Sequence, residues 1–170
     1  MTQKGFETIL RALNDAGVRY LVAGGIAVIA HGYLRATSDI DLVLALTDEN
    51  LVKAVNLFEG MGYRPRIPVA LKDLADASKR RQWIEEKHAV VFSLYGPHPL
   101  DWHVDIFLQA PFDFETEWNR AERIELKSHL IVPVVALETL ISMKIAAGRH
   151  KDQDDVLQLQ RIWRGGIEHA

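Results

Sequence analysis

The sequence predicts a domain of mixed α/β (α+β) class. It has a mixed central β-sheet, flanking helices and further helices at the C-terminal end. Two observations support this prediction. In the first part of the chain, short apolar segments alternate with segments whose apolar residues recur at helical spacing, the order expected of strands and helices in a mixed sheet. After about residue 134 only the helical pattern continues. We therefore expect one domain over residues 1–170, with the sheet core at about 1–134 and C-terminal helices at about 135–170.

The composition is that of an ordinary globular domain. The chain has 170 residues, of which 48% are hydrophobic and 25% charged, enough for one sizeable core. Its net charge of −3 does not favour nucleic acid or an anionic membrane as a partner, although a local basic patch is compatible with it. The chain has no cysteine, which excludes disulfides, zinc–thiolate sites and cysteine nucleophiles.

Neither a signal peptide nor a membrane span is predicted. The first residues, MTQKGFETILRALNDAG, follow an amphipathic helix pattern without the continuous apolar segment of a signal peptide. No apolar run approaches the roughly 18 residues of a span. We expect a cytoplasmic protein that does not associate with a membrane.

Apolar periodicity and glycine positions predict the first elements. A helix begins near residue 6, because apolar side chains recur at helical spacing until Gly17. The elements predicted next are a strand at 18–23, a break at Gly24-Gly25, a short helix at 26–30 that ends near Gly32, and a strand at 39–46.

Capping and turn residues predict the later elements. Thr47 is a natural N-cap, with acidic residues in the first turn, for a helix that ends near residue 61. The elements predicted after it are a short strand near Tyr63, a charged helix-like segment at 71–83, strands at 89–94 and 103–108 separated by the turn sequence YGPHPLD, an extended, edge-like segment at 123–134, and helices at 137–147 and 152–163 with Gly148 between them.

Two of the predicted strands carry carboxylates. Side chains alternate between the faces of a strand, so Asp39 and Asp41 point one way while Ile40 and Leu42 point the other. Asp105 is centred in another apolar strand. A buried, unpaired carboxylate is costly, whereas Mg²⁺ takes oxygen ligands and neutralises adjacent carboxylates. We therefore predict a metal site made by the three aspartates.

The Gly24-Gly25 pair follows a strand and opens a helix. Glycine lets the backbone approach a ligand, and free N–H groups at the start of a helix attract phosphate. The pair fits neither the GxGxxG nor the GxxxxGK[ST] pattern, so a Rossmann dinucleotide site and a P-loop are disfavoured. A triphosphate held by this short loop and by metal on the carboxylates accounts for both features. The alternative is a tight turn that needs glycine for steric reasons alone.

These residues resemble the nucleotidyltransferase superfold that includes DNA polymerase β. There, a Gly-Gly or Gly-Ser turn opens a helix, a D-x-D strand follows, and a third acid lies on a later strand. The matching residues here are Gly24-Gly25, Asp39-Ile40-Asp41 and Asp105, with His31-Gly32, Arg35 and Thr37 between the turn and the first acids. The chain looks most like bacterial AbiEii-type and related uncharacterised nucleotidyltransferases. The C-terminal residues that match this group are Lys144, Arg149, Lys151, Asp152 and Asp155.

The resemblance implies a nucleotidyltransferase fold and Mg²⁺-dependent transfer of an NMP group from an NTP to an acceptor hydroxyl, with release of pyrophosphate. Asp39, Asp41 and Asp105 would be the catalytic and metal-binding residues. They would hold two Mg²⁺ ions, for which Mn²⁺ can substitute, about 3.5–4 Å apart, and Asp105 would also take a proton. The nucleotide-binding residues it implies are Gly24, Gly25, Arg35, Thr37, Lys144, Arg149, Lys151 and Asp152, the last orienting a neighbouring base.

Several other side chains have structural alternatives. Arg35 is expected either to contact phosphate or to pair with Asp39 or Asp41 when metal is absent. His31 is expected to be structural, and His103 is either a partner beside Asp105 or a surface histidine. The four tryptophans are expected in the core or an interface rather than in a base-stacking platform; they are Trp83, Trp102, Trp118 and Trp163.

The resemblance leaves the acceptor and the partners open. The acceptor is RNA, a protein or a small molecule, and a homodimer or a cognate antitoxin is compatible with a role in a toxin–antitoxin or phage-defence system. Enzymes that modify antibiotics usually enclose the acceptor with an additional domain or a dimer partner, and this chain is short for that. A non-catalytic binding module is the alternative from another class, although all three acids are present. A metal-dependent hydrolase is disfavoured, because the seven histidines are scattered without an H-x-H or H-x-x-x-H pair.

Overall fold

A seven-stranded mixed sheet forms the centre of the molecule. The computed structural model describes residues 5–168. The strand order is β3-β4-β5-β2-β1-β7-β6, in which β2 pairs with β5 and β1 with β7 in parallel, and all other neighbours are antiparallel. The strands are β1 (Tyr20–Ala23), β2 (Asp39–Leu44), β3 (Arg64–Pro65), β4 (Val91–Tyr95), β5 (His103–Phe107), β6 (Glu122–Glu125) and β7 (Ile131–Val134). The mixed α/β fold with C-terminal helices is as the sequence predicts.

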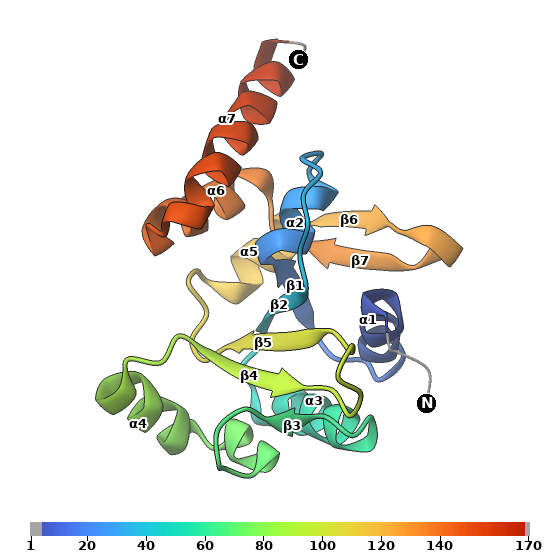
Figure 1. Cartoon of the computed structure of the whole chain (residues 1–170), viewed down its shortest axis with the longest axis vertical. Coiled ribbons are helices and arrows are strands. Elements are labelled where there is room, and N and C mark those ends of the chain that lie inside the picture. Colours follow the sequence, from blue (N-terminus) through green and yellow to red (C-terminus); the bar gives the residue numbers. More distant parts are fainter. Residues whose placement is uncertain (1–4, 169–170) are drawn as a thin grey trace.

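The helices lie around this sheet. They are α1 (Phe6–Asp15), α2 (Gly24–Ala30), α3 (Asp48–Gly60), α4 (Ala77–Lys87), α5 (Phe114–Arg120), α6 (Leu137–Ala147) and α7 (Gln153–Glu168), with 3₁₀ turns at Leu71–Ala75, Lys127–His129 and His150–Asp152. Figure 1 shows α6 and α7 together at one end, beside α2, and α3 and α4 at the other. Within residues 5–168, none of these helices is long and apolar enough to cross a bilayer.

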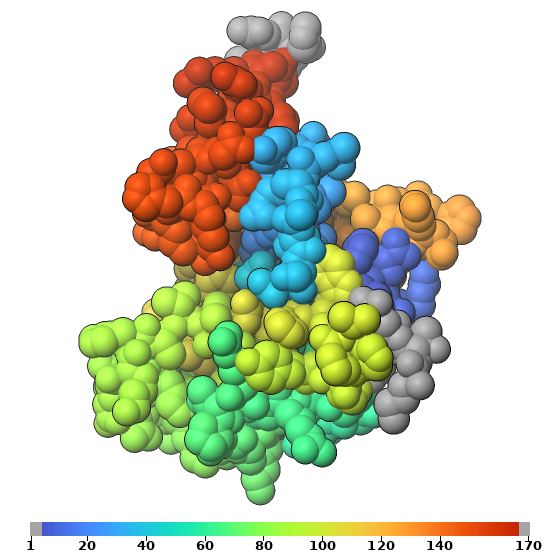
Figure 2. Space-filling view, viewed as in Figure 1, coloured from blue at the N-terminus to red at the C-terminus, as the bar shows by residue number. Residues whose placement is uncertain are grey.

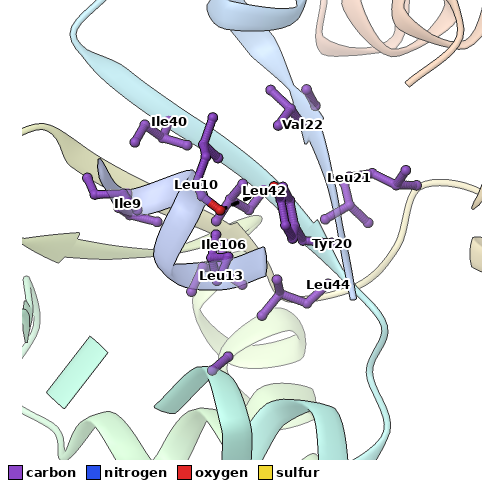
Figure 3. Close-up of a cluster of buried hydrophobic side chains, with 14 of the residues drawn as sticks. Ile9, Leu10, Leu13, Tyr20, Leu21, Val22, Ile40, Leu42, Leu44 and Ile106 are labelled. Atoms are coloured by element: carbon purple, nitrogen blue, oxygen red, sulfur yellow. Dashed lines mark hydrogen bonds between the residues drawn. The ribbon is translucent and has the colours of Figure 1, made fainter. Parts of the chain in front are cut away.

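Alternation along β2 and β5 separates the core from the opposite face of the sheet. Ile40 and Leu42 of β2 and Val104 and Ile106 of β5 are fully buried, and they pack with apolar residues of α1 and β1 in one continuous core (Figure 3). The residues between them, which include the three aspartates, are on the other face. Burial of the apolar side chains on one face therefore fixes how β2 and β5 are oriented, and this places the aspartates on the other face.

Several predicted boundaries are confirmed. Thr47 caps α3 by accepting a hydrogen bond from Asn50 N, because a threonine hydroxyl satisfies a free N–H group at a helix start. The helix predicted at 137–147 is α6, and Gly148 ends it in the left-handed conformation. The charged segment predicted as one helix at 71–83 is a 3₁₀ turn followed by α4, because Asp76 caps a new helix start.

The prediction for residues 123–134 is wrong in one respect, and α5 was not predicted. The segment forms two strands, of which β6 is at the edge of the sheet and β7 is internal. β7 meets β1 at a single register pair, Val22 and Val134. Pro133 has no N–H to extend that ladder, so a proline normally found at an edge is accommodated inside the sheet. The strand predicted near Tyr63 begins one residue later, at Arg64.

Asn50 connects the end of β2 to the start of β1. Its side chain is buried, accepts a hydrogen bond from Arg19 N at 2.7 Å, and donates to Arg19 O and Ala45 O, each at 2.9 Å. These three bonds satisfy backbone groups where the strands enter the core. The amide thus holds the two strands together at the end opposite the aspartates.

We predict that Asn50→Ala lowers the free energy of unfolding by about 2–4 kcal/mol. Arg19 N and Ala45 O lose their side-chain partner, and Arg19 O keeps only its bond from Ala45 N. Urea denaturation measures the change, and Gln82→Ala, at an exposed position of α4, is the control that we expect to change stability by less than about 0.5 kcal/mol. A loss below about 1 kcal/mol for Asn50→Ala contradicts this account.

Candidate active site

The three predicted acids lie on one face of two neighbouring parallel strands. Asp41 of β2 is directly opposite Asp105 of β5, and Asp39 is opposite His103. Neighbouring strands lie about 4.8 Å apart, so paired residues of β2 and β5 lie side by side. Residues that are 64 positions apart in the sequence are thereby brought into one acidic row.

Each carboxylate has its own contacts in this structure. Asp105 Oδ1 accepts a hydrogen bond from Ser93 Oγ at 2.5 Å, Asp39 Oδ1 is 3.6 Å from His103 Nδ1, and the Asp41 carboxylate packs against Gly24. Among the residues described, no three His, Asp or Glu side chains are gathered closely enough to enclose a metal ion. The three acids therefore have three different partners in this structure.

The chemistry of these donors nevertheless fits a hard divalent cation. Burial is the main cause that raises the pKa of Asp41 to about 6, and the negative charges of Asp105 and Asp39 raise it further. Lys144 and Arg149 offset only part of this effect. A cation among three carboxylates removes the repulsion, and carboxylate oxygens are ligands that Mg²⁺ and Mn²⁺ accept. Asp39, Asp41 and Asp105 could therefore hold the ion after side-chain rotation.

The two glycines make room for side chains of the protein itself. Gly24 has a φ of +61°, and a Cβ there would overlap the Asp41 carboxylate. A Cβ at Gly25 would lie 2.5 Å from Thr37 Oγ1 and 3.3 Å from the Arg35 guanidinium. The glycines therefore have a steric role, since they let β2 and its preceding loop pack against the start of α2. Their part in nucleotide binding stays a prediction.

A cavity of about 870 Å³ opens over the acids. Its walls come from the start of α2, the loop before β2, β4, β5 and the C-terminal helices. Figure 2 shows this loop (cyan) between the C-terminal helices (red) and β4 and β5 (yellow-green). The predicted site residues that line the cavity are Gly24, Gly25, Arg35, Thr37, Asp39, Asp41, Asp105, Lys144, Arg149 and Lys151.

Asp152 is the one predicted site residue that does not line this cavity. Its side chain is 2% exposed and accepts hydrogen bonds from Lys144 Nζ at 3.0 Å and Arg149 Nε at 2.6 Å. Burial acts to raise the pKa of the Asp152 carboxyl, but the hydrogen bonds and positive charges of Arg149 and Lys144 together outweigh it and hold the pKa below its usual range. Asp152 thus positions two cations and has no exposed oxygen for a nucleotide.

A buried ion network joins the C-terminal helices to the loop before β2. The Lys144 side chain is 6% exposed, and its Nζ lies 2.9 Å from Asp155 Oδ2 as well as close to Asp152. Asp155 Oδ1 in turn accepts a hydrogen bond from Arg35 Nε at 2.9 Å. Tyr33 in the same loop donates a hydrogen bond to Asp154. The expectation that Arg35 pairs with Asp39 or Asp41 is therefore wrong, because Asp155 holds it.

Sequence reasoning missed some of these residues. Asp155 belonged to the C-terminal motif without an assigned role, and Ser93 and Tyr33 were not singled out at all. Ser93 contacts Asp105 only because β4 pairs with β5 in one register, which the sequence does not show. His31, expected to be structural, is buried and donates from Nε2 to Val135 O at 2.8 Å.

The tryptophans lie mainly in packing positions. Trp83 stacks on Phe92, Trp102 contacts Phe6, and Trp118 stacks on Phe114. Trp163 of α7 is 40% exposed. None of the four lines the cavity over the acids among the residues described.

Comparison with solved structures shows which known fold the chain shares. The lincosamide antibiotic adenylyltransferase LnuA, in a lincomycin-bound crystal structure, matches with a TM-score of 0.62 and 16% identity over 95% of this chain and 99% of that one. ANT(2″)-Ia, in complex with adenylyl-2″-tobramycin, matches with a TM-score of 0.55 and 16% identity over 94% and 85% of the two chains. A putative nucleotidyltransferase from Thermotoga maritima matches with a TM-score of 0.50 and 14% identity over 99% and 98%. The fold is that of the nucleotidyltransferases.

The sequence also assigns the chain within this class. Residues 6–163 match the model of one family, and the chain belongs to it: nucleotidyltransferase of unknown function (DUF6036). Among curated proteins, none matches the sequence significantly. Enzymes of the nucleotidyltransferase class in general use a divalent metal, in agreement with the donor set described above.

We predict that Asp41→Asn stabilises the metal-free protein at neutral pH. An aspartate whose pKa rises from 3.8 in the unfolded chain to about 6 in the folded one costs nothing below about pH 4. The cost grows between pH 4 and 6 and is constant above, at about 2–3 kcal/mol.

The measurement is urea unfolding of wild type and Asp41→Asn in EDTA at pH 4, 5, 6 and 7.5. The difference between the two proteins should increase over that range in favour of the variant. A difference that does not vary with pH means that Asp41 is not destabilised by its surroundings.

Proposed function

We propose that this protein is a nucleotidyltransferase that uses Mg²⁺ or Mn²⁺ to transfer an NMP group from an NTP to an acceptor hydroxyl, with release of pyrophosphate. The observation that carries the proposal is the parallel pairing of β2 with β5, which places Asp41 beside Asp105 and Asp39 at the floor of a cavity. Lys144, Arg149 and Lys151 line the wall of the same cavity that the C-terminal part of the chain forms. Acids for metal and cations for phosphate thus face one space.

The acids and the cations have different tasks in this proposal. Asp39, Asp41 and Asp105 hold the metal, which when bound screens phosphate charge and acidifies a coordinated hydroxyl. Arg149, whose side chain is 55% exposed, and the exposed Lys151 contact the triphosphate. Lys144 is buried between two carboxylates, so its contribution to nucleotide binding is to keep Arg149 and Asp152 in place.

The family resemblance suggests a cellular setting as well. The C-terminal motif from Lys144 to Asp155 is the reason to propose an AbiEii-type enzyme, with a role in a toxin–antitoxin or phage-defence system and a cognate antitoxin or second copy as partner. A non-catalytic member of the fold is the opposing proposal, and nucleotide binding distinguishes the two.

A small-molecule acceptor is the second candidate, and one comparison favours it. LnuA is an antibiotic adenylyltransferase, and the match covers 99% of its chain. A chain of about this length is thus found in a lincomycin-bound enzyme, so chain length alone does not argue against a small-molecule acceptor. At 16% identity the likeness concerns the fold, and the acceptor has to be decided by other observations.

We predict that an NTP raises the melting temperature of the wild-type protein with Mg²⁺ but not with EDTA, and that Asp39→Asn and Asp105→Asn each abolish the rise. A ligand at 100 times its Kd adds about 2.7 kcal/mol to the apparent stability. Thermal denaturation with each of the four NTPs measures the effect and identifies the preferred base.

Asp15→Asn, at an exposed position at the end of α1, is the matched control and should respond like wild type. If Asp39→Asn and Asp105→Asn keep the Mg²⁺-dependent shift, the triphosphate is not held through these acids. If folded wild type shows no shift with any NTP, the non-catalytic alternative is supported instead.

A further inference from the structure

The face of the sheet that carries the acids continues beyond them, onto β4 and β3. The register places Ser93 of β4 opposite Asp105 and, since the same ladder is antiparallel, Tyr95 next to His103. Tyr95 is opposite Arg64 of β3. One row of side chains therefore runs from Asp39 through His103 and Tyr95 to Arg64.

A second row runs parallel to the first. It begins with Asp41 and Asp105, continues with Ser93, and reaches Arg66, whose N–H donates to Ser93 O at 2.9 Å. The Arg66 guanidinium lies 5.8 Å from the centre of the Tyr95 ring. This contact places Arg66 on the same face of the sheet as Tyr95 and the acids.

The side chains at the far end of these rows are accessible. Arg64 and Arg66 are exposed, and the exposed fraction of Tyr95 is 39%. Among the side chains described, neither arginine forms an ion pair. Figure 2 shows β4 and β5 at the surface of the drawn face. The two positive charges thus face solvent, on the side of the acids away from Lys144 and Arg149.

Ring and cation–π contacts between neighbouring residues hold the side chains of this surface in place. The ring of Tyr95 packs edge-on against His103, with centroids 4.9 Å apart, while Arg66 lies over the same ring. His103 also approaches Asp39, with Nδ1 3.6 Å from Oδ1. Aromatic and basic groups therefore connect Asp39 to the edge of the sheet without an intervening helix.

We propose that this surface, made of Arg64, Arg66, Tyr95 and His103, binds the acceptor, and that the acceptor is the end of a single-stranded nucleic acid. The proposal rests on the proposed function, since the terminal hydroxyl is placed at the acids. Arg64 and Arg66 bind backbone phosphates, and the exposed rings of Tyr95 and His103 pack against a sugar or base. Basic residues interleaved with aromatics are how proteins bind single strands.

The span of the rows favours a polynucleotide over a small acceptor. β2 and β3 are separated by three strand spacings, about 14 Å in total. A ligand whose hydroxyl lies at Asp39 must extend across β5 and β4 to place an anionic group at Arg64. A polynucleotide carries phosphates along its whole length, whereas a compact antibiotic has no anionic group at that distance.

The smaller cavity beside the site offers less to an acceptor. It has a volume of about 410 Å³ and lies between α5 and α6. Its charged residues are already engaged, since Glu117 accepts hydrogen bonds from Ala136 N and Thr139 Oγ1, and Arg120 pairs with Glu138 at 2.9 Å. Arg64 of β3 and Arg66 directly after it form no such ion pairs within residues 5–168, and they are the better recognition element.

The test is binding of a fluorescent 12-nucleotide single strand, as RNA and as DNA, measured by anisotropy at several KCl concentrations. We expect Arg64→Gln/Arg66→Gln to weaken binding at least tenfold at 50 mM KCl. Loss of two phosphate contacts should also reduce the slope of log K against log[salt] by about 1.4. Tyr95→Ala should weaken binding with the salt slope unchanged. A preference for RNA over DNA would indicate that the 2′-hydroxyl is recognised.

Arg161→Gln/Arg164→Gln, at exposed positions of α7, is the matched control with the same change of charge and should bind like wild type. Equal weakening by both double variants, or wild type that binds neither strand, overturns the proposal. So does adenylylation of tobramycin or lincomycin at a rate that Arg64→Gln/Arg66→Gln does not change.

The Mg²⁺-dependent thermal shift with NTP separates this proposal from the proposed function. A protein that shows the shift but binds no single strand retains the nucleotidyltransferase function and loses this acceptor. A protein that binds strands through Arg64 and Arg66 without any NTP shift retains the surface and loses the transfer reaction.

Discussion

The arrangement of the site depends on one buried ion network, in which Lys144 is shared between Asp152 and Asp155. A lysine with 6% of its side chain exposed is tolerated only when its charge is compensated, and removal of one partner from such a network costs several kcal/mol. Here the compensation comes from Asp152 in the 3₁₀ turn before α7 and from Asp155 in the first turn of α7. Asp155 also accepts a hydrogen bond from Arg35 in the loop before β2. The network therefore determines the position of the C-terminal helices relative to the acids. It thereby also positions the basic residues that line the cavity.

Much of the fold could be predicted from the sequence because local rules agree with the tertiary structure. Apolar periodicity placed α1, the cap at Thr47 placed α3, and Gly148 marked the end of α6. The failures occur where distant pairing decides the outcome. Nothing in the local pattern shows that β7 lies inside the sheet, since Pro133 is typical of an edge, and α5 is a short polar helix that forms where Glu117 accepts hydrogen bonds from the start of α6.

The candidate site was also predictable only in part. Alternation along a strand was enough to place Asp39 and Asp41 on one face, and the structure puts Asp105 beside them. The sequence did not show which residues hold these groups in position. Arg35 bonds to Asp155 across 120 positions of chain, and Ser93 meets Asp105 only through the register of β4 and β5. Gly24 and Gly25 are required by Asp41 and Thr37, a steric reason that becomes visible only when β2 lies against α2.

The two faces of the sheet also differ in how freely they can evolve. On one face Ile40, Leu42, Val104 and Ile106 are fully buried, so substitutions there are limited by packing. On the other face, Arg64 of β3 and Tyr95 of β4 are exposed. Substitutions at these exposed positions therefore cost little stability. They can change which molecules bind beside the aspartates. The same sheet can serve descendants with different acceptors while its acidic row is unchanged.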